Sequence, residues 1–474
     1  AVLGRGKRID PSARDKAAEI LRLHREDPEA LAAYNLEDAR LVPEILEREG
    51  LLALAVERSR LSGMPLDRVG ASVASFDRLY LPELRRRGYV APSVGYDRPA
   101  ASVRGGALLE PRPGLWRGVA VFDFKSLYPS LIRTFQLDPL AHATAGEDAV
   151  VAPGGARFAR EGALLPQILE RLAGRRAAAR ARGDRHADQA IKIMMNALFG
   201  VLGTPGCRFF DPELANAITG FGQAVLAWTR DAFEARGVEV LYGDTDSVFV
   251  RLGEEEDADR RASRAEALRE EVEAAVHARI RADHRVEPHL ALELQHVFER
   301  LWLPRLRTGP RGSKKRYAGW VDGQLVTVGL EAVRRDWPAV AARLQTGLLT
   351  RLFTDRELAP FVAEVVAAVR EGRLDDELVY RKRLRKGSVD RYTKSTPPHI
   401  QAARKAGVRE GRLVRYVITR RGPEPVRHGE PLPEDLDRRH YVERVLRPVA
   451  ESILSEVGIH FDDLVGRPRQ LDLL

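Results

Sequence analysis

The feature that most constrains the fold is a six-residue stretch with the sequence YGDTDS at residues 242–247. It lies between two apolar, β-favouring runs at residues 238–241 and 248–250. Gly and Asp between two such runs are typical of a tight β-hairpin. We therefore expect the carboxylates of Asp244 and Asp246 to lie together at the tip of a hairpin.

Two neighbouring carboxylates need a physical reason to be held together. At about 4 Å they repel by roughly 1 kcal/mol in water, and by several times more at a lower effective dielectric constant. A cation offsets this repulsion, or one carboxyl group keeps its proton. Mg²⁺ suits such a pair because it binds few carboxylates and retains waters and substrate phosphates. A lone Asp-x-Asp is also typical of a polar turn on the protein surface. The choice between a metal site and a surface turn therefore rests on the other motifs of the chain.

Composition narrows the class of partner. The chain has 474 residues, enough for roughly two to four domains. No apolar run approaches the ~20 residues that span a bilayer, and residues 1–7 lack the apolar core of a signal peptide, so we expect no membrane partner. The single cysteine, Cys207, excludes an internal disulfide and suits a reducing cytoplasm. The net charge of +9 favours a polyanionic partner such as nucleic acid, although basic solubility alone gives the same number.

A further carboxylate follows another apolar run. Residues 119–124 predict a buried strand that delivers Asp123 near its end. The turn that follows, KSLYPS at residues 125–130, directs backbone N–H groups that are suited to a phosphate. The end of this strand is therefore a second candidate for metal and phosphate chemistry.

Helical and basic segments complete the chain. Residues 164–200 predict a hairpin of two helices with a break at residues 182–184. We expect basic side chains on the inward faces of this hairpin, and the alternative is an arginine face exposed to solvent. We also expect helices over 212–236 and 254–285, strands and turns over 286–333, and a mostly helical region after Asp336. The basic cluster KKRY at residues 314–317 suits phosphate contacts, with its aromatic ring against a sugar or base.

In their order and spacing, four motifs resemble the polymerase motifs of family B DNA polymerases. They are DxxSLYPS at residues 123–130, KxxxNAxFG at 192–200, YGDTDS at 242–247 and KKRY at 314–317. Further stretches resemble the bacterial DNA polymerase II branch of that family: VLGT at 201–204, CRFFDP at 207–212, GLE at 329–331 and PPH at 397–399. The resemblance covers essentially the whole chain.

The resemblance implies an α+β, right-hand fold. Its palm is an antiparallel sheet covered by helices, its fingers are helical and its thumb is mostly helical. The implied domains are an exonuclease-domain remnant (1–57), a connection (58–112), a first palm segment (113–155), fingers (156–203), a second palm segment (204–335) and a thumb (336–474).

The resemblance also implies template-directed DNA synthesis from deoxynucleoside triphosphates by two-metal phosphoryl transfer, in repair or replication restart at the bacterial nucleoid. Two Mg²⁺ ions, with Mn²⁺ as a substitute, would be held at Asp123, Phe124, Asp244 and Asp246. Asp123 and Asp246 would be the principal ligands, with Asp244 close by.

Substrate-binding roles follow from the same resemblance. Backbone N–H groups of Ser126 and Leu127 would meet the triphosphate, and Tyr128 would underlie the sugar and exclude a 2′-hydroxyl. The remaining nucleotide-binding residues would be Arg175, Lys192, Asn196 and Phe199. The primer-template duplex would be contacted by Lys314, Lys315, Arg316 and Tyr317.

The finger helices depart from the family pattern at three positions. Phe199 stands where the family usually has Tyr, and Ala197 where Ser is common, which puts fidelity in doubt more than activity. The family usually has a second basic residue in the fingers, and Ala179 occupies its position here. Arg180, the next residue, would be an imperfect substitute.

The two ends carry further expectations. Tyr34 and Asp38, which share a helix face, resemble the third motif of the family's 3′→5′ exonuclease, although an ordinary helix contact gives the same pair. Without the first two motifs upstream, we expect no exonuclease activity. At the other end, Gln470, Leu471, Leu473 and Leu474 resemble the peptide with which bacterial polymerases bind the sliding clamp, and the alternative is that these leucines pack on the thumb.

Three rival functions remain. The first is a fragment that binds DNA but has no activity. Half of an exonuclease domain would expose a surface that is buried in the whole domain. Another nucleotidyltransferase, such as an RNA polymerase, is disfavoured by the steric role of Tyr128. A metal-binding structural protein is disfavoured by the joint presence of four motifs.

Overall fold

The computed structural model of the chain describes residues 3, 16–95, 105, 108–253, 257–306, 312–384, 396–407, 413–427 and 430–465. The chain divides into two compact units. Unit 2 contains residues 45–111 and 117–298, and unit 1 contains residues 1–44, 112–116 and 299–474.

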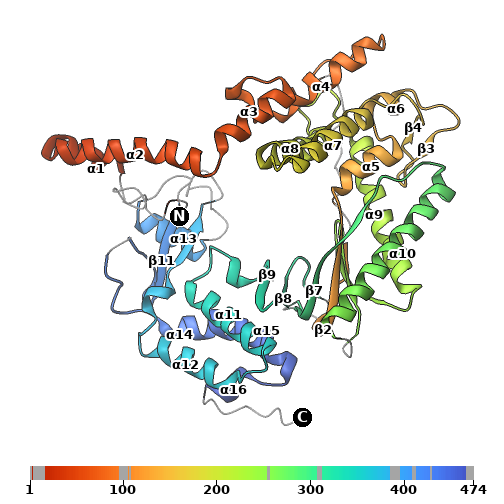
Figure 1. Cartoon of the computed structure of the whole chain (residues 1–474). Helices are drawn as coiled ribbons and strands as arrows, with labels where there is room; N and C mark the ends of the chain where they lie inside the picture. The colour runs from red at the N-terminus through yellow and green to blue at the C-terminus, as the bar shows by residue number, and fades with distance from the viewer. Residues whose placement is uncertain are drawn as a thin grey trace. The chain divides into compact units, whose positions relative to one another are not determined.

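Unit 2 contains an antiparallel sheet and most of the long helices (Figure 1). Its helices are α3 (Leu51–Ser62), η1 (Leu66–Arg68), α4 (Ser72–Arg86), α5 (Leu127–Phe135), α6 (Pro139–Ala143), α7 (Leu165–Ala181), α8 (Arg185–Leu202), α9 (Pro212–Glu234) and α10 (Ala258–His284). Its strands are β1 (Leu108–Leu109), β2 (Gly114–Phe124, entering from unit 1), β3 (Val150–Val151), β4 (Arg157–Phe158), β5 (Glu239–Asp244) and β6 (Ser247–Arg251).

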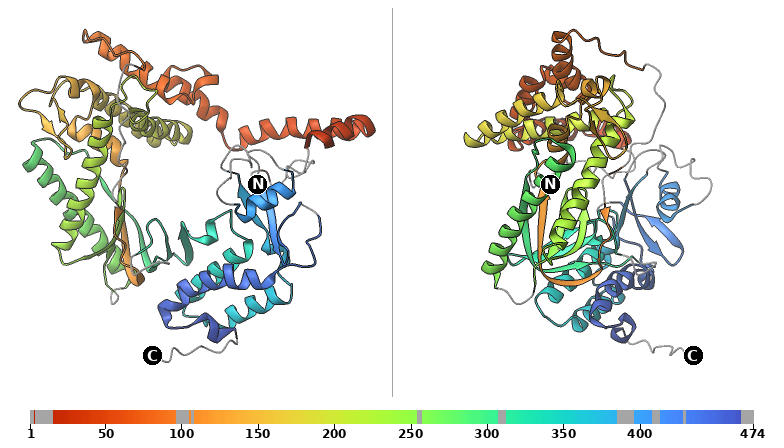
Figure 2. Two further views of the ribbon diagram at one scale, coloured as in Figure 1. Left: turned by 180° about the vertical axis from the view of Figure 1, so that it is seen from behind. Right: turned by 90° about the vertical axis from the view of Figure 1, so that its right-hand side faces the viewer.

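The strands of unit 2 lie in the order β1-β5-β6-β2, and their pairs are antiparallel. Residues 119–122 of β2 are all buried. They form a continuous apolar run without polar alternation, which is typical of a strand covered on both faces. Helix α9 packs on β5 and β6, and α10 packs on α9, as the two views of Figure 2 also show. The rings of Phe122 on β2 and Phe233 on α9 lie 4.8 Å apart within this core.

The predicted helical hairpin is confirmed as α7 and α8, which pack on each other and on neighbouring helices of unit 2. Asp184 begins α8 by accepting a hydrogen bond from the N–H of Ala187, as short polar residues do at helix N-termini. The helices expected over 212–236 and 254–285 are confirmed as α9 and α10.

A buried carboxylate ties the start of α7 to the body of unit 2. Asp138 accepts hydrogen bonds from the hydroxyl of Tyr80 at 3.0 Å, the N–H of Leu140 at 2.9 Å and the N–H of Leu165 at 2.8 Å. Burial raises the pKa of Asp138, while these hydrogen bonds oppose the rise. One side chain therefore links α4, α6 and α7, because a buried acceptor must find donors.

Unit 1 contains the remaining helices and strands. Its helices are α1 (Lys16–Glu26), α2 (Pro28–Arg48, ending in unit 2), η2 (Glu331–Val333), α11 (Ala339–Phe353), α12 (Ala359–Arg370), η3 (Asp375–Leu378), α13 (Pro398–Lys405), α14 (Arg438–Tyr441), the π-helix η5 (Val442–Leu446), α15 (Arg447–Leu454), η6 (Ser455–Val457) and α16 (Phe461–Leu464). Its strands are β7 (Leu292–Leu303, entering from unit 2), β8 (Tyr317–Val321), β9 (Gln324–Val328), β10 (Tyr380–Arg383), β11 (Leu413–Thr419) and β12 (Gly422–Pro425).

The region after Asp336 is mostly helical, as predicted, but it also contains the three-stranded sheet β10-β11-β12, which we did not predict. Residues Tyr380–Arg383 form β10, which lies at the edge of this sheet. Tyr380 pairs with Tyr416 on β11, and their rings stack with centroids 5.0 Å apart. This pairing joins segments far apart in sequence, so local periodicity does not reveal it.

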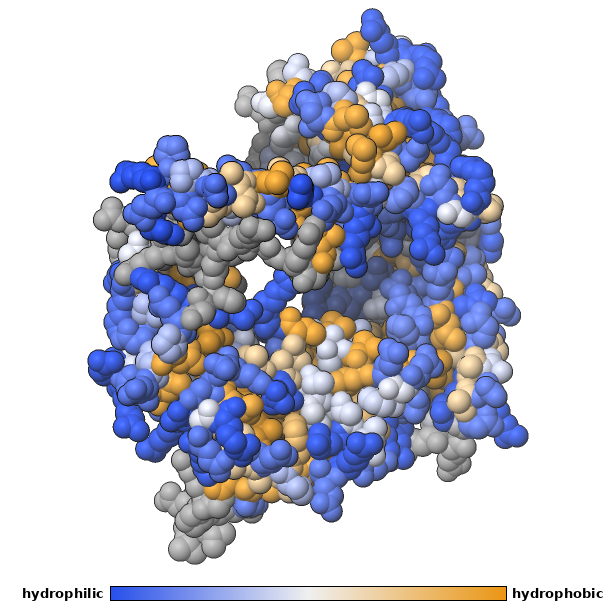
Figure 3. Space-filling model, turned by 60° about the vertical axis from the view of Figure 1, so that its left-hand side comes forward, coloured by the Kyte–Doolittle hydropathy of each residue, from blue (hydrophilic) through white to orange (hydrophobic). Residues whose placement is uncertain are grey.

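Within the portion of the chain that the structure describes, no helix is both long enough and apolar enough to cross a bilayer. Hydrophilic side chains predominate on the face drawn in Figure 3, in keeping with 77 Lys and Arg and 68 Asp and Glu residues. The chain is therefore rich in charged residues of both signs, with a net charge of +9.

Candidate active site

The YGDTDS stretch forms the predicted tight hairpin. Strand β5 ends at Asp244 and β6 begins at Ser247, so Thr245 and Asp246 make the turn. The N–H of Asp246 donates to the carbonyl of Asp244 at 2.6 Å. Thr245 adopts a left-handed conformation with φ of 59°. The turn thus places Asp244 at its start and Asp246 at its end, as expected.

Strand pairing brings Asp123 to this turn. Asp123 on β2 lies opposite Ser247 in the antiparallel register with β6. One residue further on, the N–H of Phe124 donates to the carbonyl of Asp246 at 2.9 Å. Residues more than a hundred positions apart are therefore joined by backbone hydrogen bonds, and the prediction that Asp123 and Asp246 belong to one site agrees with this register.

The site concentrates charge that a cation would offset. The pKa of Asp123 is raised from 3.8 to about 7, first by burial and then by the negative charges of Asp246 and Glu293. Lys192 on α8 lowers this pKa but does not compensate. Negative charge is thus concentrated at the end of β2, and such a concentration favours a bound divalent cation.

The carboxylates of Asp123 and Asp246 suit Mg²⁺ better than a metal ion whose ligands all come from the protein. Among the described residues, no three His, Cys, Asp or Glu side chains converge to form a ready metal site. Mg²⁺ needs only one or two carboxylates, because waters and substrate phosphates complete its shell. Asp123 and Asp246 therefore fit the ion that the sequence implies.

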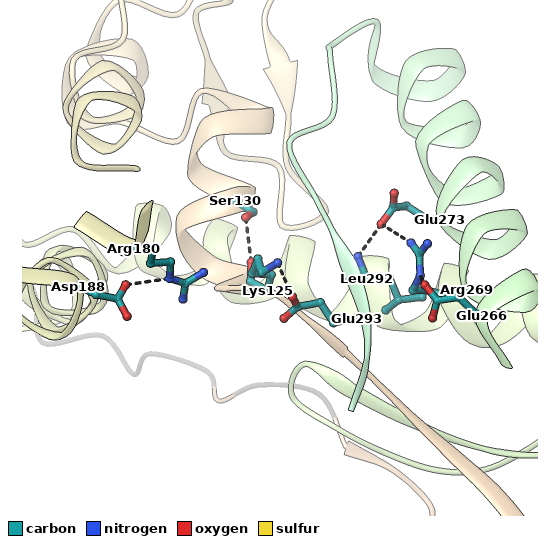
Figure 4. A network of polar contacts seen from close by, with 9 residues as sticks. All are labelled: Lys125, Ser130, Arg180, Asp188, Glu266, Arg269, Glu273, Leu292 and Glu293. Carbon is teal, nitrogen blue, oxygen red and sulfur yellow. Dashed lines mark hydrogen bonds and ion pairs between the residues drawn. The ribbon is translucent and has the colours of Figure 1, made fainter. Parts of the chain in front are cut away.

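Glu293 is a charged neighbour that we did not predict from the sequence. It lies on β7 and forms an ion pair with Lys125, the residue that follows β2 (Figure 4). The preceding residue, Leu292, is held in place because its N–H donates to Glu273 of α10 at 2.6 Å. The alternation at 292–294 is a local signal for a strand, but nothing local indicated that its glutamate lies close enough to Asp123 to raise the pKa of that carboxyl.

The start of α5 carries the predicted phosphate and sugar residues. Ser126, at the N-cap, has a left-handed backbone with φ of 51°, and α5 begins at Leu127. The ring of Tyr128 stacks on Phe199 of α8, with centroids 4.2 Å apart and planes at 24°. The pKa of Tyr128 is raised by burial and then by the charges of Asp246 and Asp244. The aromatic pair therefore lies within electrostatic reach of the carboxylates.

The finger helices present the other predicted nucleotide-binding residues on their surfaces. Lys192 and Asn196 are exposed and lie one turn apart on α8, and Arg175 is exposed on α7. Ala179, where the family's second cation falls, is fully buried. Arg180 is half-exposed and forms an ion pair with Asp188.

The basic cluster at 314–317 belongs to unit 1. Lys314 and Lys315 are exposed, and Tyr317 begins β8. Arg316 is instead half-buried and forms an ion pair with Glu331, which is 3% exposed. Its charge is thus partly offset by Glu331, and its predicted contact with DNA stays a prediction.

Two further sets of predicted residues concern the ends of the chain. Tyr34 and Asp38 are on α2, in the portion of that helix that belongs to unit 1, and Tyr34 is 4% exposed. The residues predicted to bind a clamp lie outside the described residues: Gln470, Leu471, Leu473 and Leu474.

Comparison with known proteins gives one consistent group of relatives. A family model described as DNA polymerase family B matches residues 70–423. The chain is 41% identical to DNA polymerase II of Escherichia coli (strain K12), over 98% of this chain and 61% of that protein. It is 28% identical to DNA polymerase 2 of Aeropyrum pernix, over 94% of this chain and 56% of that protein.

A solved structure gives the same result at the level of the fold. The family B DNA polymerase of Pyrobaculum calidifontis matches with a TM-score of 0.61 and 26% identity, over 97% of this chain and 63% of that one. The chain thus spans about three fifths of the length of each of these three relatives.

The raised pKa of Asp123 predicts a stability effect. Because its folded-state pKa is raised from 3.8 to about 7, the metal-free protein should lose stability as pH rises from about 4 to about 7, with little further loss above that. Asp123→Asn removes the buried charge, so we expect this variant to be more stable than wild type at pH 8, by ~1–2 kcal/mol after allowance for solvent screening.

Thermal unfolding in a chelator at about pH 5 and about pH 8 measures this difference. The difference should shrink at the lower pH, and the exposed-site variant Asp259→Asn on α10 should behave like wild type. A wild type at least as stable as Asp123→Asn at pH 8 would contradict the repulsion assigned to the site.

Proposed function

This chain belongs to DNA polymerase family B, and we propose from that membership that it extends the 3′-hydroxyl of a DNA primer with deoxynucleoside triphosphates. The observation that carries the proposal is the register that sets Asp123 on β2 beside Asp246 at the β5–β6 turn. We further propose a role in repair or replication restart at the bacterial nucleoid, in keeping with the similarity to DNA polymerase II.

The domain roles belong to the same proposal. Residues 113–155 and 204–335 act as palm, 156–203 as fingers and 336–474 as thumb. Residues 58–112 connect to the palm, and residues 1–57 belong to an exonuclease domain.

The carboxylates bind the catalytic cations. Asp123 and Asp246 would hold two Mg²⁺ ions, or Mn²⁺ in their place, with the main chain of Phe124 and the side chain of Asp244 nearby. When bound, the ions offset the charge that develops on the attacking and leaving oxygens of an in-line phosphoryl transfer. The raised pKa of Asp123 supports this assignment, because a cation relieves the repulsion from Asp246.

The incoming triphosphate is positioned by groups of opposite charge. Backbone N–H groups at Ser126 and Leu127 donate to its oxygens, since the first N–H groups of a helix have no partner within the helix. Lys192 and Arg175 neutralise its charge, and Asn196 adds a polar contact. The exposure of these three side chains on α7 and α8 supports these roles.

Tyr128 limits the sugar that the site accepts. Its ring is fixed by stacking on Phe199, so it resists displacement by a larger sugar. Lys314, Lys315, Arg316 and Tyr317 contact the sugar-phosphate backbone of the duplex. Arg316 also forms an ion pair with Glu331.

Primer extension with Mg²⁺ tests the activity. Asp246→Asn should reduce extension by at least about 10³-fold, because several kcal/mol of charge stabilisation are lost. Binding to primer-template should stay close to the wild-type level and weaken steeply with salt, as phosphate contacts release counterions. Asp259→Asn serves as the control. Normal extension by Asp246→Asn would refute the site, and DNA binding without extension by wild type would identify an inactive DNA-binding fragment.

Removal of the ring at Tyr128 tests sugar selection. Tyr128→Ala should raise the incorporation of ribonucleotides relative to deoxynucleotides, because the space for a 2′-hydroxyl opens. Tyr128→Phe keeps the ring and should retain the wild-type ratio. The ratio of the two kcat/KM values is the measurement, and an equal ratio in Tyr128→Ala and wild type would exclude the steric role.

We also propose that residues 470–474 bind a sliding clamp. Leu473 and Leu474 would fill an apolar pocket, and a short peptide of this kind binds with roughly micromolar affinity because it loses conformational entropy. The double substitution Leu473→Ala and Leu474→Ala should abolish stimulation by a clamp and leave synthesis without a clamp unchanged. A lowered melting temperature with intact stimulation would instead assign these leucines to the thumb core.

A further inference from the structure

An open groove lies between the turn that follows α3 and one face of α4, two neighbouring helices of unit 2 (Figure 1). Its volume is about 620 Å³. The floor is apolar and is formed by Met64 and Pro65 of the turn and by Leu81 and Pro82 of α4. None of the residues that line the groove belongs to the candidate active site. The groove is therefore an apolar surface feature that the proposed function does not use.

The α4 side of the groove has a regular pattern of charge. Arg78, Leu81, Pro82 and Arg85 stand at positions i, i+3, i+4 and i+7, so they follow one stripe of the helix. Seven residues span about 10 Å along the helix axis, so the two arginines flank the apolar pair. The guanidinium group of Arg78 lies over the turn, because a Cβ added at Gly63 would come within 3.1 Å of its Nη2.

The two arginines of this stripe have charge to offer a partner. In the portion of the chain that the structure describes, neither Arg78 nor Arg85 forms an ion pair, whereas the adjacent Arg86 pairs with a glutamate at 2.9 Å. Asp77, the acidic residue that lines the groove, is already paired with Arg208 at 3.0 Å. The groove thus combines an apolar centre with an uncompensated positive charge at each end.

We propose that the groove binds an amphipathic helix of a partner protein, whose contact stripe is acidic, apolar, apolar and acidic at positions i, i+3, i+4 and i+7. Such a stripe has the same rise as that of α4, so its carboxylates reach Arg78 and Arg85 while its apolar pair covers Leu81 and Pro82. Apolar burial supplies the affinity, and the charges fix the register and select the partner. A nucleic-acid backbone would contact the arginines but leave the apolar floor exposed, so a protein partner fits better.

Fluorescence anisotropy with a labelled synthetic peptide tests this inference. The probe is an alanine-based helical peptide of about 18 residues that contains one Glu-x-x-Leu-Leu-x-x-Glu stripe. The full chain should bind it with a dissociation constant in the micromolar range, and a peptide with both leucines replaced by serine should bind about tenfold more weakly because apolar burial is lost. Arg78→Glu and Arg85→Glu should each weaken binding about five- to tenfold, since attraction becomes repulsion. Arg260→Glu, at an exposed arginine on α10, is the matched control and should bind like wild type.

An exchange of charges separates a specific contact from general attraction to a basic protein. The chain that carries both Arg78→Glu and Arg85→Glu should prefer a peptide with Lys in place of both Glu residues by about tenfold, with an unchanged melting temperature. Equal binding of the leucine and serine peptides, or charge reversals that leave peptide affinity unchanged, would overturn the inference.

Two further results would also overturn it by assigning the groove to another occupant. A loss of primer-template affinity in the double variant beyond that in Arg260→Glu would assign the two arginines to nucleic acid. A dimer in analytical ultracentrifugation that dissociates in Arg78→Glu would assign the groove to a second copy of this chain. We expect neither change, because the apolar floor and the stripe fit the acidic helix of a different protein.

Discussion

The antiparallel register between β2 and β6 is the constraint on which the candidate site depends. It sets Asp123 opposite Ser247 and bonds the N–H of Phe124 to the carbonyl of Asp246. Two carboxylates are thereby held together by main-chain hydrogen bonds, which side-chain repulsion cannot break. The surrounding core, with Phe122 packed on Phe233 of α9, keeps the strands in this register.

Basic side chains elsewhere in unit 2 partly offset this concentration of negative charge. Lys192 on α8 acts against it, and Lys125 pairs with Glu293. The buried carboxylate of Asp138 fixes the start of α7, while Arg176 and Asp188 fasten α7 to α8. Lys192 and Arg175 are therefore carried by a helical hairpin that hydrogen bonds hold in place, as the proposed binding of a triphosphate requires.

Features with a local sequence signal were predictable. The hairpin that carries Asp244 and Asp246, the strand that ends near Asp123 and the break between α7 and α8 all follow from apolar runs and turn residues. The resemblance to family B polymerases supplied the link between these separate segments.

Features that depend on long-range register were not predictable. Glu293 raises the pKa of Asp123 only because of where β7 lies, and β10 pairs with β11 across some thirty residues. The ion pair between Arg316 and the buried Glu331 likewise has no local signal in the basic cluster. In each case a partner distant in sequence decides what the side chain does.

The central claim is that Asp123 and Asp246 jointly hold the catalytic cations. Anomalous diffraction from crystals of the chain with primer-template, a non-hydrolysable deoxynucleotide and Mn²⁺ tests it most directly. We expect Mn²⁺ peaks coordinated by the carboxylates of both residues, and their loss in Asp123→Asn. Ordered DNA and nucleotide with Mn²⁺ bound elsewhere, or with peaks unchanged in the variant, would contradict it.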